Sequence, residues 1–163
     1  MELDYSKFLT LGKEIEERFR YNFNRFLITS SLEDQKGVDL TLNLTFDVKK
    51  ARKIRRKDDN VSYDKMWIEY KNVYGKKGSI CKKNLDFFII ESENSWLVKS
   101  RKDAYELFVE QAKGKELKYL DSKVEVELYQ PYRRLGREDV IMLVEMNNPK
   151  WPTVMDIPKG LPS

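Results

Sequence analysis

The spacing of apolar residues predicts two helices. Over residues 4–26, phenylalanine, leucine and isoleucine recur every three or four positions, which is typical of the buried stripe of an amphipathic helix. Glu16 lies at the margin of this stripe. A second helix is predicted to begin at Ser100, because Asp103 completes an N-terminal capping pattern, and to end at Gly114.

Alternating apolar and polar residues predict the strands. The alternation is unbroken from Val38 to Val48 and predicts either one long strand or two short ones that turn near Asn43. Further strands are predicted over residues 66–73, 85–91, 95–99, 124–129 and 140–146. This order of elements predicts an α+β (mixed α/β) fold. We expect one domain over residues 1–148, with a central, mostly antiparallel or mixed sheet, and an irregular, proline-containing tail over residues 149–163.

The composition removes several classes of function. The chain has 163 residues, no histidine and one cysteine, Cys81. Catalytic triads with histidine, histidine-ligated metals and cysteine-rich zinc sites are therefore excluded. Any catalysis must use carboxylates, lysine, tyrosine or bound ions. No apolar run is long enough to span a membrane, and no signal peptide is visible, so we expect a soluble cytoplasmic protein without a membrane partner.

Basic residues are clustered, although the formal net charge is only +4. Seven of the nine residues from 49 to 57 are basic: Lys49, Lys50, Arg52, Lys53, Arg55, Arg56 and Lys57. Two smaller patches contain Lys76 with Lys77 and Arg133 with Arg134. A run of like charges repels itself unless an anionic partner neutralises it. The clusters therefore predict binding to nucleic acid, with DNA as the expected partner and RNA not excluded.

Two acid-x-Lys triplets are the candidates for chemistry. Asp47 and Lys49 form the first, and Glu69 and Lys71 form the second. Residues i and i+2 of a strand point to the same side, so each triplet presents a carboxylate beside an ammonium group. Most such pairs on a strand surface are solvated ion pairs. Two or three carboxylates together, however, would hold Mg²⁺ or Mn²⁺, and a neighbouring lysine could position a metal-bound water.

The context of these triplets resembles the PD-(D/E)XK nuclease superfamily, including its phage and restriction-type members. The resemblance consists of a first helix that carries Glu16, the sequence Gly37-Val38-Asp39 at the start of a strand, and an acid-x-Lys triplet after it. The strand over residues 85–90 and the helix from Ser100 are also similar. The resemblance implies a metal-dependent DNA endonuclease, often a homodimer, encoded by a phage or mobile element. It also implies that Glu16 is an outer carboxylate that orders a hydrated ion.

Two arrangements of the carboxylates remain open. If the chain turns near Asn43 and again near residues 58–60, Glu69 lies beside Asp47 or Lys49 in an antiparallel meander. We favour this arrangement, which has Asp39, Asp47 and Glu69 as metal ligands and Lys49 as the water-positioning group. In the stricter arrangement, Asp39, Glu69 and Lys71 form the site.

Two functions without catalysis use the same charges. A nucleic-acid-binding module would need only the basic segment 49–57. A basic scaffold protein would use the same charges to bind acidic proteins. An enzyme differs from both because it needs its carboxylates close together around a cation.

Overall fold

The computed structural model describes residues 44–54, 60–121 and 124–159. The first helix predicted from the sequence, with Glu16, and the segment with Asp39 and the turn near Asn43 lie outside these residues. The described elements, in chain order, are β1 (Phe46–Lys49), β2 (Lys65–Lys71), the 3₁₀ turn η1 (Ser79–Cys81), β3 (Phe87–Glu91), β4 (Ser95–Ser100), α2 (Arg101–Ala112), β5 (Lys118–Leu120), β6 (Pro131–Arg134), β7 (Val140–Glu145) and β8 (Thr153–Pro158). This mixture confirms the predicted α+β class.

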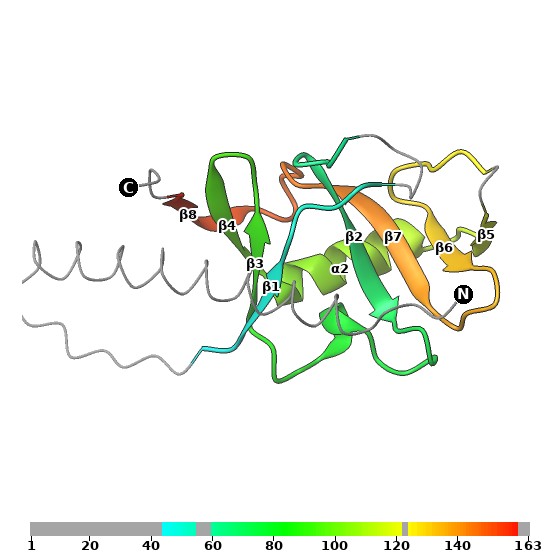
Figure 1. The fold of residues 1–163 in the computed structure, drawn as a ribbon. Coiled ribbons are helices and arrows are strands. Elements are labelled where there is room, and N and C mark those ends of the chain that lie inside the picture. The colour runs from blue at the N-terminus through cyan, green and yellow to red at the C-terminus, as the bar shows by residue number, and fades with distance from the viewer. Residues whose placement is uncertain (1–43, 55–59, 122–123, 160–163) are drawn as a thin grey trace, which may run out of the picture.

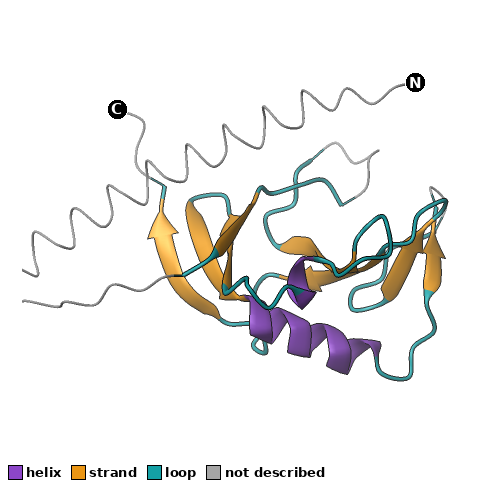
Figure 2. Cartoon of the chain, turned by 90° about the horizontal axis from the view of Figure 1, so that it is seen from below, coloured by secondary structure: helices purple, strands orange, loops and turns teal. Residues whose placement is uncertain are grey.

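The described strands form two sheets rather than one central sheet. The first has the order β1-β3-β4-β8 and the second has the order β2-β7-β6-β5 (Figure 1). Each sheet is mixed, because β1 is parallel to β3 and β5 is parallel to β6, while the other neighbours are antiparallel. Helix α2 packs on β2, β3 and β4 and so joins the two sheets on one side (Figure 2).

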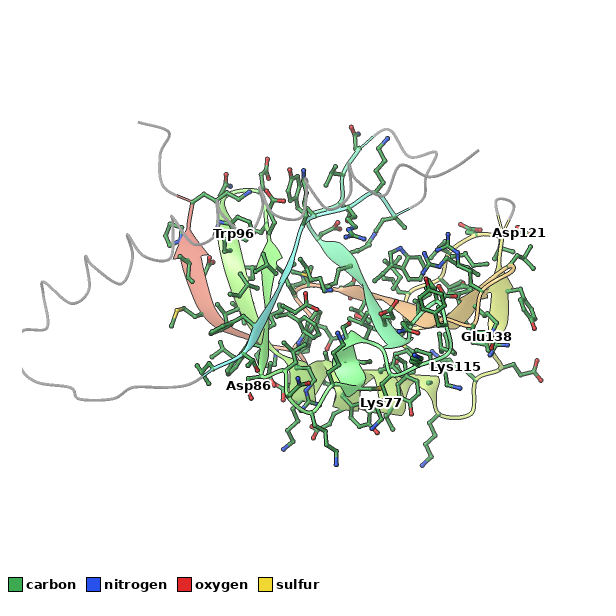
Figure 3. All side chains as sticks on the ribbon, turned by 60° about the horizontal axis from the view of Figure 1, so that its bottom comes forward. Lys77, Asp86, Trp96, Lys115, Asp121 and Glu138 are labelled. Carbon is green, nitrogen blue, oxygen red and sulfur yellow. The ribbon has the colours of Figure 1, made fainter. Side chains whose placement is uncertain are left out.

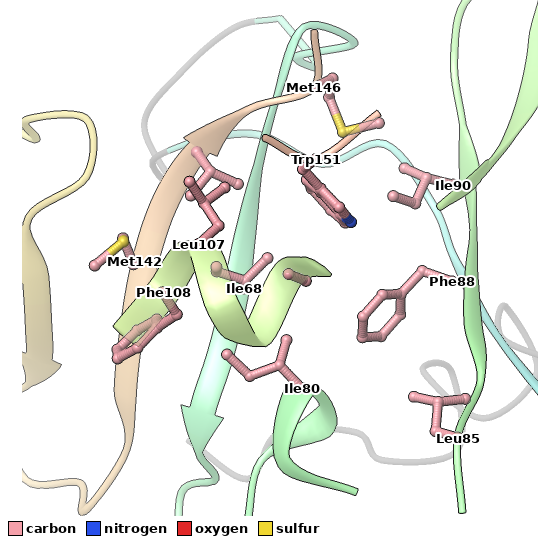
Figure 4. Close-up of a cluster of buried hydrophobic side chains, with 12 residues drawn as sticks. Ile68, Ile80, Leu85, Phe88, Ile90, Leu107, Phe108, Met142, Met146 and Trp151 are labelled. Carbon is pink, nitrogen blue, oxygen red and sulfur yellow. The ribbon is translucent and has the colours of Figure 1, made fainter. Parts of the chain in front are cut away.

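One apolar cluster lies between the helix and the two sheets. It combines Ile68 of β2, Phe88 of β3, Leu107 of α2 and Met142 of β7, each at most 1% exposed, with Trp151 at 0% (Figure 4). Burial of each such side chain contributes about 1.5–3 kcal/mol to folding. A second, smaller cluster on the first sheet contains Ile89, Trp96, Val98 and Ile157. Because Ile89 lies between Phe88 and Ile90 in β3, the two clusters occupy opposite faces of this sheet.

Helix α2 begins as its sequence predicts. The Ser100 side chain accepts a hydrogen bond from the backbone N–H of Asp103 at 3.2 Å, which is the expected cap. The helix ends at Ala112, and Gly114 follows with a φ of 76°, a conformation that glycine adopts without a steric cost. None of the helices in the described part of the chain is long and apolar enough to span a membrane.

The segment expected to be an irregular tail contains a strand. Residues 153–158 form β8, which pairs with β4 at the edge of the first sheet. Ile157 is the only buried residue of this strand, so its sequence has no clear apolar alternation. Trp151 anchors the approach to β8, because its Nε1 donates to the Ser100 carbonyl at 2.9 Å.

A second difference concerns residues 124–129, which were expected to form a strand that pairs with residues 140–146. In the structure β7 pairs with β2 on one side and on the other with β6, which begins only at Pro131. Tyr129 has a φ of 60°, which interrupts an extended chain before β6. The strand prediction over residues 124–129 was therefore wrong.

The buried lysine of β4 gives a test of this packing. Lys99 is 1% exposed, donates to the Trp151 carbonyl and lies 4.8 Å from the centre of the Trp151 ring. Burial lowers the pKa of Lys99 from 10.5 to about 8, and the nearby Asp103 opposes this shift. Between these pH values the unfolded chain binds more protons than the folded one, so the free energy of unfolding should rise with pH.

We predict that this rise, at most about 3 kcal/mol between pH 8 and pH 10.5, is present in the wild type and absent in Lys99→Met. Urea unfolding of both proteins at a series of pH values measures it. The difference between the two proteins removes the contribution of the other groups that titrate in this range. Parallel stability curves for the two proteins would contradict the lowered pKa of Lys99.

Candidate functional site

The two acid-x-Lys triplets lie on edge strands of different sheets. Asp47 of β1 is in register with Phe88 of β3, whereas Glu69 of β2 is in register with Ile141 of β7. The predicted antiparallel pairing of β1 with β2 is therefore wrong. The parallel pairing instead places Val48 beside Ile89, with its apolar side chain against the second cluster. In the view of Figure 1, β1 runs beside β3, while β2 belongs to the other sheet.

The chain does turn back after the basic segment, as the sequence indicated. Arg52 and Ser62 form an antiparallel bridge in which the Ser62 N–H donates to the Arg52 carbonyl at 3.1 Å. Trp67 Nε1 donates to the Ile54 carbonyl at 3.1 Å and ties this arm to β2. Lys50 is half-buried, and Arg52 and Lys53 are exposed. The remaining predicted nucleic-acid ligands of the arm, Arg55, Arg56 and Lys57, lie outside the described residues.

The first triplet forms the ion pair that strand geometry predicts. Lys49 Nζ lies 2.8 Å from Asp47 Oδ2, and the two side chains are 32% and 29% exposed. The side-by-side orientation of residues i and i+2 is thus confirmed for this pair. A consequence is that the Asp47 carboxylate is already neutralised by Lys49.

Glu69 is in a different environment. It lies half-buried in β2, on the face opposite Ile68, and its carboxylate makes no hydrogen bond or ion pair with any residue that the structure describes. Burial raises the pKa of Glu69, and the charges of Lys49, Arg134 and Lys82 lower it, while Asp139 raises it further. A carboxylate that is partly removed from water without a hydrogen bond is costly. Glu69 is therefore a carboxylate whose burial is not offset by a side-chain partner within the described residues.

Gly78 holds the backbone of β2 at this position. Its N–H donates to the Tyr70 carbonyl at 2.8 Å. A Cβ atom on residue 78 would lie 2.2 Å from the Glu69 carbonyl oxygen, so only glycine allows this close approach. The loop after β2 is thereby packed against the backbone of Glu69 and Tyr70.

The second triplet does not repeat the geometry of the first. The pairing of β2 with β7 shifts register between Glu69 and Lys71, and Lys71 is exposed. Such an irregularity changes the direction of the side chains that follow it. Lys71 is not among the groups that shift the pKa of Glu69, whereas Lys49 of the other sheet is. Of the two triplet lysines, it is thus Lys49 of the first and not Lys71 of the second that acts on the pKa of Glu69.

A buried ion pair adjoins Glu69, and the sequence had indicated only half of it. Asp139 is 0% exposed, and its Oδ2 accepts from Arg134 Nε and pairs with Arg134 Nη2. Its Oδ1 accepts from the backbone N–H of Arg134 at 3.1 Å. Arg134 was a predicted nucleic-acid ligand, but Asp139 was missed. The available signal was an acid between a turn at Gly136 and the apolar strand β7.

The remaining predicted ligands are in the turn after β2 and on the other face of β6. Lys76 and Lys77 are exposed in the turn after β2, and Figure 3 shows Lys77 at the lower rim of the molecule. Arg133 precedes Arg134 on the opposite face of β6. Its Nε is buried and has no hydrogen-bond partner among the described residues.

The predicted metal centre is not assembled from the described residues alone. Within residues 44–54, 60–121 and 124–159, no three Asp, Glu, Cys or His side chains lie together so that they could hold a metal ion. Asp39, the third carboxylate of the prediction, lies outside these ranges, as does Glu16. No family model, curated protein or solved structure matches the chain.

The effect of Lys49 on Glu69 can be measured directly. Because the Lys49 charge favours the ionised carboxylate, we predict that Lys49→Met raises the pKa of Glu69 and that Lys71→Met changes it less. Carbon-13 NMR of the side-chain carboxyl groups during a pH titration gives this pKa, with Glu69→Gln to assign the resonance. A larger shift in Lys71→Met would assign the neighbouring cation to the second triplet.

Proposed function

We propose that the protein is a metal-dependent nuclease that hydrolyses phosphodiester bonds in DNA. The observation that carries the proposal is Glu69, a half-buried carboxylate with no hydrogen-bond partner in the described part of the chain, next to cationic side chains of both sheets. A bound divalent cation would offset the cost of burying this carboxylate, and the cations would favour a phosphate. The resemblance of Glu69-Tyr70-Lys71 to a nuclease motif supports the same assignment.

The residues fit a magnesium ion only in part. Glu69 offers the hard oxygen ligands that Mg²⁺ and Mn²⁺ prefer. Asp39 is the proposed second ligand, on the strength of the resemblance, and Asp47 could join only by leaving Lys49. When bound, the ion supplies Lewis-acid activation of the phosphate and a more acidic water.

The chain's own groups have separate roles in this proposal. Lys49, oriented by Asp47, would position the attacking water or stabilise the charge that develops on the phosphate. Lys50, Arg52 and Lys53 would follow the phosphate backbone away from the site. Cutting both strands of a duplex would require two copies of the site, so we propose a homodimer for double-strand cleavage.

A non-catalytic nucleic-acid-binding module is the second candidate. It is favoured by two observations. The described residues contain no group of three potential metal ligands, and Asp47 is paired with Lys49. Such a module would use the exposed cations of the 49–54 arm and leave Glu69 without a chemical role. The two candidates differ in whether a divalent ion produces cleavage.

We predict that Glu69→Gln lowers the cleavage rate by a factor of at least about 10², because the ion loses a charged ligand. Stability should be unchanged or higher, since the amide avoids the cost of burying a charge. Glu106→Gln is the matched control, because Glu106 is exposed on α2 and pairs with the exposed Lys102.

The measurement uses labelled single- and double-stranded DNA and RNA with Mg²⁺, Mn²⁺ or EDTA. Cleavage that needs the ion and is lost in Glu69→Gln but kept in Glu106→Gln is the expected result. Nucleic-acid binding without cleavage under any condition would favour the binding module. Cleavage by Glu69→Gln at the wild-type rate would contradict the proposed site.

A further inference from the structure

The ion pair between Arg134 and Asp139 is built unlike the surface pairs of this protein. Asp139 is 0% exposed. Its carboxylate accepts hydrogen bonds from the backbone N–H and the Nε of Arg134 and forms an ion pair with Arg134 Nη2. The Arg134 side chain is 37% exposed. A buried carboxylate is tolerated only when it is paired and hydrogen-bonded. Asp139 therefore fixes the position of a guanidinium group whose outer part remains accessible.

Part of the guanidinium has no partner within the described residues. Arginine carries five N–H donors in a planar fork, and Asp139 engages Nε and one Nη. The other Nη group, with two N–H donors, makes no hydrogen bond to any residue in the described ranges. A preorganised fork with free donors matches the paired oxygens of a phosphate.

The strand register places this fork on the same face as Glu69. Ile141 of β7 is the register partner of Glu69 in β2 and of Tyr132 in β6. The side chains of these three residues therefore lie in one row on the same face of the sheet. Arg134 is two residues from Tyr132 in β6 and lies on the same side. The shift that the Arg134 charge produces in the pKa of Glu69 agrees with this placement.

We propose that Arg134, held by Asp139, is a binding residue that clamps one phosphate of the nucleic-acid substrate beside Glu69. The inference rests on the proposed function for its choice of substrate, but it concerns binding and needs no metal ion. It separates Arg134 from its neighbour Arg133, which lies on the opposite face of β6. Asp139 is in this view a positioning residue, because it acts through Arg134.

A salt titration of binding separates a phosphate contact from a structural staple. Each phosphate contact adds to the slope of log K against log salt concentration, whereas a residue that only supports folding does not. We measure the binding of a fluorescent DNA duplex in EDTA, so that cleavage cannot occur, at several salt concentrations. The proteins are the wild type, Arg134→Gln, Arg134→Lys, Asp139→Asn and the control Lys102→Gln. The control removes one positive charge from the exposed side of α2, where Lys102 is 73% exposed.

We expect Arg134→Gln to reduce the slope by about 1 and Lys102→Gln to leave it unchanged. Arg134→Lys should keep the slope but bind more weakly, because it retains the charge and loses the fork. Asp139→Asn should also weaken binding while Arg134 remains. Circular dichroism checks that each variant is folded. If Arg134→Gln does not fold, the weaker binding expected of Arg134→Lys tests the clamp instead.

Equal slopes for Arg134→Gln and the wild type, or binding by Arg134→Lys equal to the wild type, would overturn the clamp, as would a wild type that does not bind DNA. The two outcomes for the Arg134 variants are distinct from failure of the proposed function, whereas a wild type that does not bind DNA would overturn both. A protein that shows the expected slopes but never cleaves with Mg²⁺ or Mn²⁺ would retain the clamp and lose the nuclease.

Discussion

The alternation of β2 is the constraint on which the candidate site depends. Ile68 is 1% exposed because it packs into the cluster shared by α2 and both sheets. A strand that buries one residue must direct the next to its other face, so the packing of Ile68 fixes the position of Glu69. Gly78 then holds the backbone from the side of the following loop. The position of the Glu69 carboxylate is thus set by core packing and not by a side-chain hydrogen bond within the described residues.

Pairing of charges divides the acids of the site into two kinds. Asp47 has Lys49 and Asp139 has Arg134, so both carboxylates are neutralised within the chain. Glu69 has nearby cations but no direct partner among the described residues, and burial raises its pKa. In the proposed nuclease, the carboxylate that has no direct partner in the described residues is the one that would bind the divalent cation. This difference is the physical basis for proposing Glu69 as the main ligand of the metal ion.

Local patterns predicted much of the fold, and long-range pairing was the part they could not supply. The strands β2, β3, β4 and β7 follow from the alternation of apolar and polar residues, and the start of α2 follows from the capping pattern of Ser100 and Asp103. The partner of β1 was wrong because alternation shows which side chains share a face but not which strand lies alongside. β8 was missed because it buries only Ile157. Asp139 was missed because its place between a turn and an apolar strand does not show whether the side chain is buried.

Binding of Mn²⁺ in the absence of nucleic acid tests the central role of Glu69 most directly. Isothermal titration calorimetry of the full chain at neutral pH compares the wild type with Glu69→Gln and with Asp47→Asn. We predict that Glu69→Gln weakens Mn²⁺ binding by at least about tenfold, and that Asp47→Asn has a smaller effect because Asp47 is paired with Lys49. Equal Mn²⁺ affinity for the wild type and Glu69→Gln, or a wild type that binds no Mn²⁺, would contradict this prediction.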